Sequence, residues 1–101
     1  MKSKAAIQIE FHVVTQQAGE LASCADEMQA IRRKLNAVAD SLRAGWAGES
    51  AELYLQKCAQ LAEKLKASEK NLDQAAGVIE KSARAYRDAE LAAIQLAQEN
   101  A

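Results

Sequence analysis

Ala44-Gly45-Trp46-Ala47-Gly48-Glu49 lies near the middle of the chain, and it decides the fold because helical patterns lead up to it and continue after it. Gly45 suits the left-handed residue that commonly ends a helix, and Arg43 in the last turn complements the helix dipole. Gly48 is suited to open the following helix, whose first turn is acidic. Two long helices joined by so short a link must fold back on each other. The stretch therefore predicts an antiparallel two-helix hairpin in an all-α protein.

Apolar side chains recur every three or four residues on both sides of the turn, which is the spacing of amphipathic helices. We expect the two stripes to form the a/d seam of an antiparallel, coiled-coil-like pair. The sequence predicts a single domain over residues 1–101, with a helix at about 10–44, the turn at 45–48 and a second helix at about 49–97. The seam residues, for the hairpin and for a dimer, are Leu21, Met28, Ile31, Leu35, Val38 and Leu42 before the turn, and Leu61, Leu65, Leu72 and Ile79 after it.

The beginning of the first helix follows a different pattern. Apolar residues from Ile7 to Val13 alternate with period two, which is a strand signal, but a lone strand has no partner in this chain. We therefore expect residues 5–9 to be an extended lead-in to a helix that starts near Glu10, with Thr15 as an alternative N-cap. A polar, frayed tail is expected after about Leu96.

Composition indicates long helices with a thin core. The chain of 101 residues has 23 alanines and no proline. Alanine favours helix but buries little apolar area, so a lone hairpin should be marginally stable. Pairing with a second copy, or with a similar hairpin, would complete a four-helix bundle. We therefore expect a homodimer or a heterodimer.

Charge and hydropathy argue against two classes of partner. The net charge is −1, from 13 basic and 14 acidic residues, whereas nucleic-acid binders carry a clustered basic excess. The basic cluster Arg32-Arg33-Lys34 fits the solvated outer face of a helix. No apolar run approaches the ~20 residues of a membrane span, and the N-terminal stretch lacks the cleavage site of a secretory signal peptide. We expect no nucleic-acid binding and no stable membrane span.

The chain also lacks the parts of an enzyme. Its one histidine, His12, fits a surface position on a helix. Cys24 and Cys58 have neither zinc-site nor redox-motif spacing, and a hairpin would hold them too far apart for a disulfide. We expect both to be free thiols buried in the seam. The sequence predicts no catalytic residue, no metal site and no cofactor.

Trp46, the largest side chain, lies within the turn. Two interpretations stay open. It is either a plug that caps the open end of the hairpin or an exposed anchor for a partner, since tryptophan is enriched in interface hot spots.

Two short motifs are placed at mid-chain and near the end. Trp46-Ala47-Gly48 is the first, and Tyr86-Arg87-Asp88-Ala89-Glu90 is the second. Each is too short to be specific alone, but their positions, the length of the chain and the two-helix pattern form a specific combination. In this combination the chain resembles, over nearly its whole length, the WXG family of ESAT-like type VII secretion substrates. The second motif is similar to the family's Tyr-x-x-x-Asp/Glu export motif.

This resemblance implies a non-enzymatic hairpin that is synthesised in the cytoplasm and secreted without a cleavable signal peptide. Trp46 and Gly48 would form the turn element of a composite export signal, and Tyr86 and Glu90 its C-terminal element, recognised by a secretion ATPase of FtsK/SpoIIIE type. About 40 residues of helix separate Trp46 from Tyr86, a rise of ~55–60 Å. We therefore expect the two elements to come from different chains of a dimer.

Other interpretations remain open. Tyr86 falls on the seam, where an aromatic residue is ordinarily part of the core, and Glu90 fits a surface ladder of charges with Arg87. Within a secreted protein, an effector and an adaptor that escorts a larger partner are both possible roles. The second candidate function is a structural or chaperone-like coiled-coil dimerisation module that is never exported.

Overall fold

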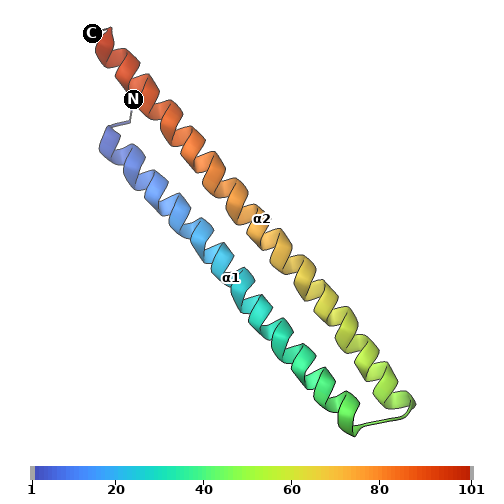
Figure 1. Cartoon of the computed structure of the whole chain (residues 1–101). Coiled ribbons are helices and arrows are strands. Elements are labelled where there is room, and N and C mark those ends of the chain that lie inside the picture. Colours follow the sequence, from blue (N-terminus) through green and yellow to red (C-terminus); the bar gives the residue numbers. More distant parts are fainter. Residues whose placement is uncertain (1, 101) are drawn as a thin grey trace. The chain divides into compact units, whose positions relative to one another are not determined.

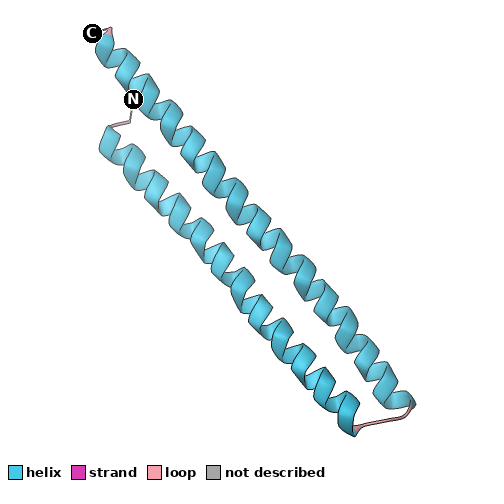
Figure 2. Cartoon of the chain, viewed as in Figure 1, coloured by secondary structure: helices cyan, strands magenta, loops and turns pink. Residues whose placement is uncertain are grey.

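The computed structural model describes residues 2–100, and within that range it contains two helices and no strand (Figure 1). Helix α1 spans Lys4–Gly45 and helix α2 spans Glu49–Glu99, with a short link between them (Figure 2). The predicted all-α helical hairpin is confirmed. The frayed tail expected after Leu96 is not found, because α2 continues to Glu99.

Helix α1 starts six residues earlier than the sequence predicted, so the expected extended lead-in over 5–9 is wrong. Ser3 is the N-cap: its Oγ accepts a hydrogen bond from the backbone N–H of Ala6 at 3.1 Å. Thr15 is not a cap. Its hydroxyl donates back to the carbonyl of Phe11 at 2.9 Å, as threonines within helices do. The alternation of apolar residues is therefore compatible with a helix as well as with an extended segment. The cap that Ser3 forms favours the helix.

The turn uses its glycines differently from the prediction. Gly45 is the last residue of α1, and the backbone N–H of Trp46 still donates to the carbonyl of Leu42 at 2.8 Å. Gly48 has a φ of 113°, and the described residues show no other positive φ. The left-handed residue is therefore Gly48, not Gly45, and it is the residue that redirects the chain into α2.

The chain divides into two compact units, each formed by parts of both helices. The first, called here the turn unit, is Ser23–Asp73 and contains the end of α1, the link and the first part of α2. Its fully buried apolar residues are all alanines: Ala25, Ala39, Ala51 and Ala62. The buried carboxylate of Glu69 joins this core. Alanines let two helices approach closely, but they leave the larger side chains at the edge of the contact.

The second unit, called here the terminal unit, comprises the described residues of Met1–Ala22 and Gln74–Ala101. Its buried apolar residues are Ile7 and Ala18 on α1, and Ala76 and Ile94 on α2. Two of these four are large, so this unit buries more apolar surface per contact position than the turn unit does. Arg87 of α2 also covers the ring of Phe11 of α1, with 4.1 Å between the guanidinium carbon and the ring centroid.

One of the two columns of side chains that form the predicted seam is displaced by one residue in the structure, and the other column is half-buried as part of the contact. In the turn unit, the buried or half-buried positions of α1 include Ala25, Arg32 and Ala39, each one residue after the predicted Cys24, Ile31 and Val38. On α2, Ala62 replaces Leu61 in the same way. Ile31, Val38 and Leu61 are 56%, 55% and 50% exposed, so as contacts within the hairpin these three predictions are wrong. The remaining seam residues are half-buried: Leu21, Met28, Leu35, Leu42, Leu65, Leu72 and Ile79.

The physical reason for this shift is that two neighbouring columns of each helix repeat every seven residues. On α1, the column with Ile31 and Val38 lies beside the column with Ala25, Arg32 and Ala39. On α2, Leu61 lies beside the column with Ala62 and Glu69. A hairpin with two helices has one contact face per helix, and it uses the column that permits close approach. The large side chains of the other column are left with half of their surface open to solvent.

Candidate functional site

The Tyr86–Glu90 motif lies on α2 in the terminal unit. Tyr86 is 63% exposed, so the interpretation of Tyr86 as a core residue is wrong. The side chain of Glu90, one helical turn later, is only 21% exposed. The motif thus presents an open phenol ring and a partly covered carboxylate on the same face of one helix.

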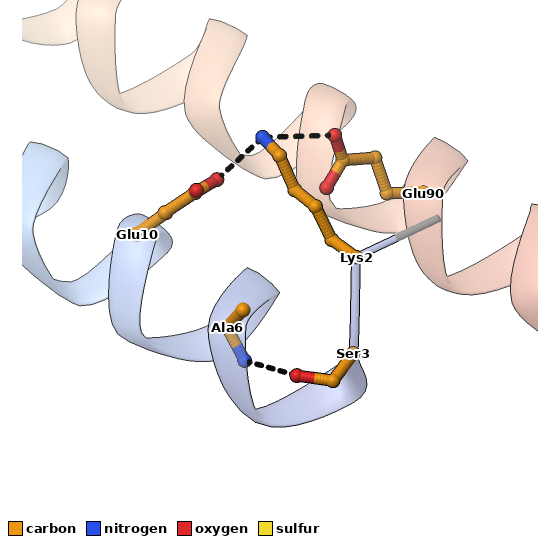
Figure 3. Close-up of polar contacts among 5 residues, drawn as sticks. All are labelled: Lys2, Ser3, Ala6, Glu10 and Glu90. Carbon is orange, nitrogen blue, oxygen red and sulfur yellow. Dashed lines mark hydrogen bonds and ion pairs between the residues drawn. The ribbon is translucent and has the colours of Figure 1, made fainter.

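The cation that faces Glu90 comes from the start of the chain. Figure 3 shows that the side chain of Lys2, the residue before the Ser3 cap, extends toward Glu10 on α1 and Glu90 on α2. Its Nζ lies 2.8 Å from Oε2 of Glu10 on α1 and 3.6 Å from Oε1 of Glu90 on α2. The same ammonium group lies 5.9 Å from the centroid of the Tyr86 ring. Lys2 therefore meets both residues of the motif.

Electrostatics at this position are consistent with that geometry. The hydrogen bond to Glu10 is the main cause that raises the pKa of Lys2, and the charge of Glu90 adds to it. Glu90 does not join the expected ladder with Arg87, whose Nε pairs with Oδ1 of Asp88 at 3.0 Å. The neighbouring ladder pair does form, between Arg84 and Glu80 at 2.6 Å.

An apolar groove adjoins the motif within the terminal unit. It has a volume of about 440 Å³, and both motif residues contribute to its lining. The walls are mainly aliphatic and aromatic side chains from the two helices: Ile7, Phe11, Val14, Val78, Ile79 and Tyr86. An apolar groove rimmed by charged groups fits a protein segment better than a polar substrate.

The turn unit carries the other motif. Trp46 is 39% exposed, and its ring lies 5.5 Å from that of Tyr54, centroid to centroid, at an interplanar angle of 43°. Tilted aromatic pairs at this distance attract each other, and this pair forms an aromatic surface beside the turn. This exposure favours the anchor interpretation of Trp46 over the plug. Gly48 supplies the backbone bend rather than a side-chain contact.

Arg32 and Glu69 form the one ion pair that links α1 to α2 among the described residues of the turn unit. Nε of Arg32 donates to Oε2 of Glu69 at 2.7 Å, and a terminal guanidinium nitrogen donates to Oε1 at 3.2 Å. These hydrogen bonds hold the pKa of Glu69 below its ordinary value, against the opposing effect of burial. The expectation that Arg32 lies on a solvated face is therefore wrong, while Arg33 and Lys34 are exposed as predicted.

The other candidate residues of the sequence are one histidine and two cysteines. His12 is exposed, as predicted. Cys24 and Cys58 are free thiols, but Cys24 is exposed and Cys58 half-buried, so their burial in the seam was a wrong prediction. Residues 2–100 contain no cluster of three metal-ligating side chains. Over the same range, neither helix has a segment long and apolar enough to cross a membrane.

Sequence reasoning missed two residues of these surfaces. Lys2 has no recognisable signal of its own in the sequence, because its approach to Glu90 depends on where α1 begins. Tyr54 has none of its own either, because its spacing of eight from Trp46 crosses the turn and follows no helical rule. One signal elsewhere in the sequence could have found both residues, namely a residue suited to begin a helix. Ser3 fixes the start of α1 and thereby the position of Lys2, and Gly48 fixes the start of α2 and thereby the position of Tyr54.

Taken together, these features define a small helical hairpin that presents short motifs and apolar side chains on its surface. Its two motifs fall within the region that a family model covers: the model described as "Proteins of 100 residues with WXG" matches residues 6–91. The chain therefore belongs to the WXG100 family, a family of small helical hairpins and not of enzymes, known as type VII secretion substrate-like proteins. The comparisons with curated proteins and with solved structures found no match.

Proposed function

We propose that this chain is a type VII secretion substrate or adaptor, synthesised in the cytoplasm and exported without a cleavable signal peptide. The observation that carries the proposal is the exposure of Tyr86 in a family member whose matched region includes the Tyr86–Glu90 motif. Tyr86 does not stand alone, because it lines an apolar groove together with aliphatic side chains of both helices, and a contiguous apolar surface of this kind fits a partner that binds it. The partner that fits is a secretion ATPase of FtsK/SpoIIIE type.

Dimerisation is the second part of the proposal. Ile31, Val38 and Leu61 leave large apolar surfaces open in the turn unit, next to the half-buried leucines of the same helices. A second helical hairpin, identical or similar, would cover them and complete a four-helix bundle. Leu21, Met28, Leu35, Leu42, Leu65, Leu72 and Ile79 would then serve both the hairpin and the dimer. The domain organisation predicted from the sequence, a single hairpin over 1–101, remains part of this proposal.

The export signal is proposed to be composite. Trp46 and Gly48 belong to the turn unit, whereas Tyr86 and Glu90 belong to the terminal unit. In the dimer, the turn element of one chain would act together with the C-terminal element of its partner. A Trp46→Ala chain and a Tyr86→Ala chain, co-expressed, would then restore one intact site. Secretion of the mixture above that of either variant alone supports the composite signal, and no gain contradicts it.

The direct test replaces Glu90 by alanine and measures secretion into the medium. We expect export to be lost while helicity by circular dichroism and the mass in solution stay unchanged, because Glu90 is only half-buried and is not one of the buried core residues of the terminal unit. Asp88→Ala is the matched control, since it removes a carboxylate two residues away, at one of the three positions of Tyr-x-x-x-Glu that the motif leaves unspecified. If Glu90→Ala is exported normally, Glu90 is not part of the export signal. If the wild-type chain itself stays in the cells, the chain is better described as a dimerisation module that is never exported.

A further inference from the structure

The N-terminal lysine occupies the place where a receptor would meet the motif. Its ammonium group is the only cationic group within 4 Å of the Glu90 carboxylate among the described residues. It also lies over the phenol ring of Tyr86, at 5.9 Å from the centroid. Both features that a partner would read, the negative charge and the π-face of the ring, are thus turned toward Lys2.

Local structure holds Lys2 at this point. Ser3 caps α1 through the N–H of Ala6, which fixes where the helix begins and directs the preceding residue toward α2. Glu10, two turns along α1, holds the ammonium group at 2.8 Å. The two acidic contacts come from different helices, so Lys2 ties the start of α1 to the motif on α2 within the terminal unit.

A receptor that recognises Glu90 needs a cation or a hydrogen-bond donor of its own at the carboxylate. That group would compete with Lys2 for the same oxygen atoms. Arg87, the nearest other cation in the motif, is already occupied by Asp88 and by the ring of Phe11. Release of Lys2 is therefore the step that frees the carboxylate.

We propose that Lys2 is an autoinhibitory clasp: in the free chain it pairs with Glu90 and lies over one face of the otherwise exposed Tyr86 ring, and the secretion receptor displaces it on binding. This inference rests on the proposed function, because it assigns a regulatory contact to the same motif. An exposed ion pair contributes little free energy, so the clasp lowers receptor affinity by a factor of about two to five. Such a factor weakens binding without preventing it. A dimer carries two motifs, so its avidity would offset this loss better than a single chain could.

Binding of the purified full chain to the cytosolic part of the secretion ATPase tests the clasp. Lys2→Gln should bind about two to five times more tightly than the wild-type chain, because the carboxylate no longer has a competing cation. Lys2→Arg keeps the positive charge and should bind like the wild type. Lys4→Gln is the matched control, since it removes the same charge two residues away and has no ion-pair partner among the described residues. Its affinity should also be unchanged.

Five outcomes separate the possibilities. Tighter binding of Lys2→Gln alone supports the clasp. Unchanged or weaker binding of Lys2→Gln, while Glu90→Ala abolishes binding, overturns the clasp and leaves the proposed function standing. Normal binding of Glu90→Ala overturns the role of Glu90 in the export signal, and the clasp with it, whereas a wild-type chain that does not bind the ATPase overturns the proposed function. Thermal melts of all variants check that each is folded, and equal gains for Lys2→Gln and Lys4→Gln would assign the effect to net charge and contradict the clasp.

Discussion

The turn unit and the terminal unit are built from the same two helices, yet they hold them together by different means. The turn unit buries only alanines and places one charged pair, Arg32 with Glu69, inside its contact. The terminal unit buries Ile7 and Ile94 and keeps its charged pairs at the surface. A buried ion pair with good geometry specifies register more than it stabilises, whereas buried isoleucines stabilise without fixing register.

This difference explains where the molecule is open to partners. In the turn unit, alanines take the contact and large side chains such as Ile31 and Leu61 stay exposed. In the terminal unit, the exposed aromatic residue belongs to a motif and faces a lysine from the same chain. The first surface suits a stable partner with a matching apolar face, and the second suits a transient receptor that exchanges one charge contact for another.

The largest expected effect comes from breaking the buried pair. Arg32→Ala should lower the melting temperature by about 10 °C or more, because Glu69 then stays in the contact without its partner. Arg87→Ala, the corresponding change in the terminal unit, should have a smaller effect, since Arg87 pairs at the surface. Replacing both members, Arg32→Leu with Glu69→Leu, should recover most of the loss. Equal effects of Arg32→Ala and Arg87→Ala would remove the distinction between the units.

The second effect concerns the partner surface of the turn unit. Ile31→Glu should weaken dimerisation by about 2 kcal/mol, roughly 30-fold, because it removes an apolar side chain from the proposed interface. Ile9→Glu is the control in the terminal unit, where the residue is similarly exposed but lies outside the proposed interface. Sedimentation equilibrium of the chain, alone and with its partner hairpin, measures both. An unchanged dissociation constant for Ile31→Glu would contradict this assignment of the surface.

A third comparison uses two glycines, one in each unit. Gly48→Ala in the turn unit should destabilise the protein by about 1–2 kcal/mol, because its φ of 113° strains any residue with a Cβ. Gly77→Ala in the terminal unit should stabilise it by up to about 1 kcal/mol, since Gly77 lies within α2 and a Cβ there meets no other atom within 4 Å. Chemical denaturation of the two variants checks the opposite signs. The same sign for both would show that the turn is less constrained than its backbone indicates.

The smallest effect is a dependence on pH that belongs to the turn unit. The pKa of Glu69 is lowered in the folded chain, so its contribution to stability is fully present above the ordinary value of 4.5. That contribution is lost as the pH falls from 4.5 through the lower folded-state pKa. The melting temperature of the wild-type chain should therefore fall more steeply below pH 4.5 than that of Glu69→Gln, by a few degrees. Parallel curves for the two chains would show that the pair does not titrate as expected.

Much of the fold was predictable because it depends on local patterns. The absence of proline, the period of the apolar residues and the acidic residues after Gly48 correctly predict two helices and the start of α2 at Glu49. The prediction failed at the start of α1, where the alternation from Ile7 to Val13 outweighed a single capping serine. Local patterns give the elements reliably, but one hydrogen bond at an end decides a boundary.

The packing and the site were less predictable, because they depend on choices between neighbouring columns and on non-local contacts. Apolar periodicity predicts that Ile31 and Val38 lie in the seam. In the structure the residues one position later lie there instead: Arg32 pairs with Glu69, and Ala39 is buried. A pattern that gives most weight to large apolar side chains does not show that small residues let the two helices approach each other more closely. The motif itself could be read from the sequence, but the contact between Lys2 and Glu90 joins residues 88 positions apart.

The central claim is that this hairpin leaves the cell through a type VII machine, and secretion of the wild-type chain tests it most directly. The measurement compares the amount of the chain in the culture medium and in the cells, with the secretion ATPase intact and with its ATP hydrolysis abolished. The account predicts that the chain accumulates in the medium only when the ATPase is active. Equal amounts in the medium under both conditions, or retention in the cells under both, would contradict it.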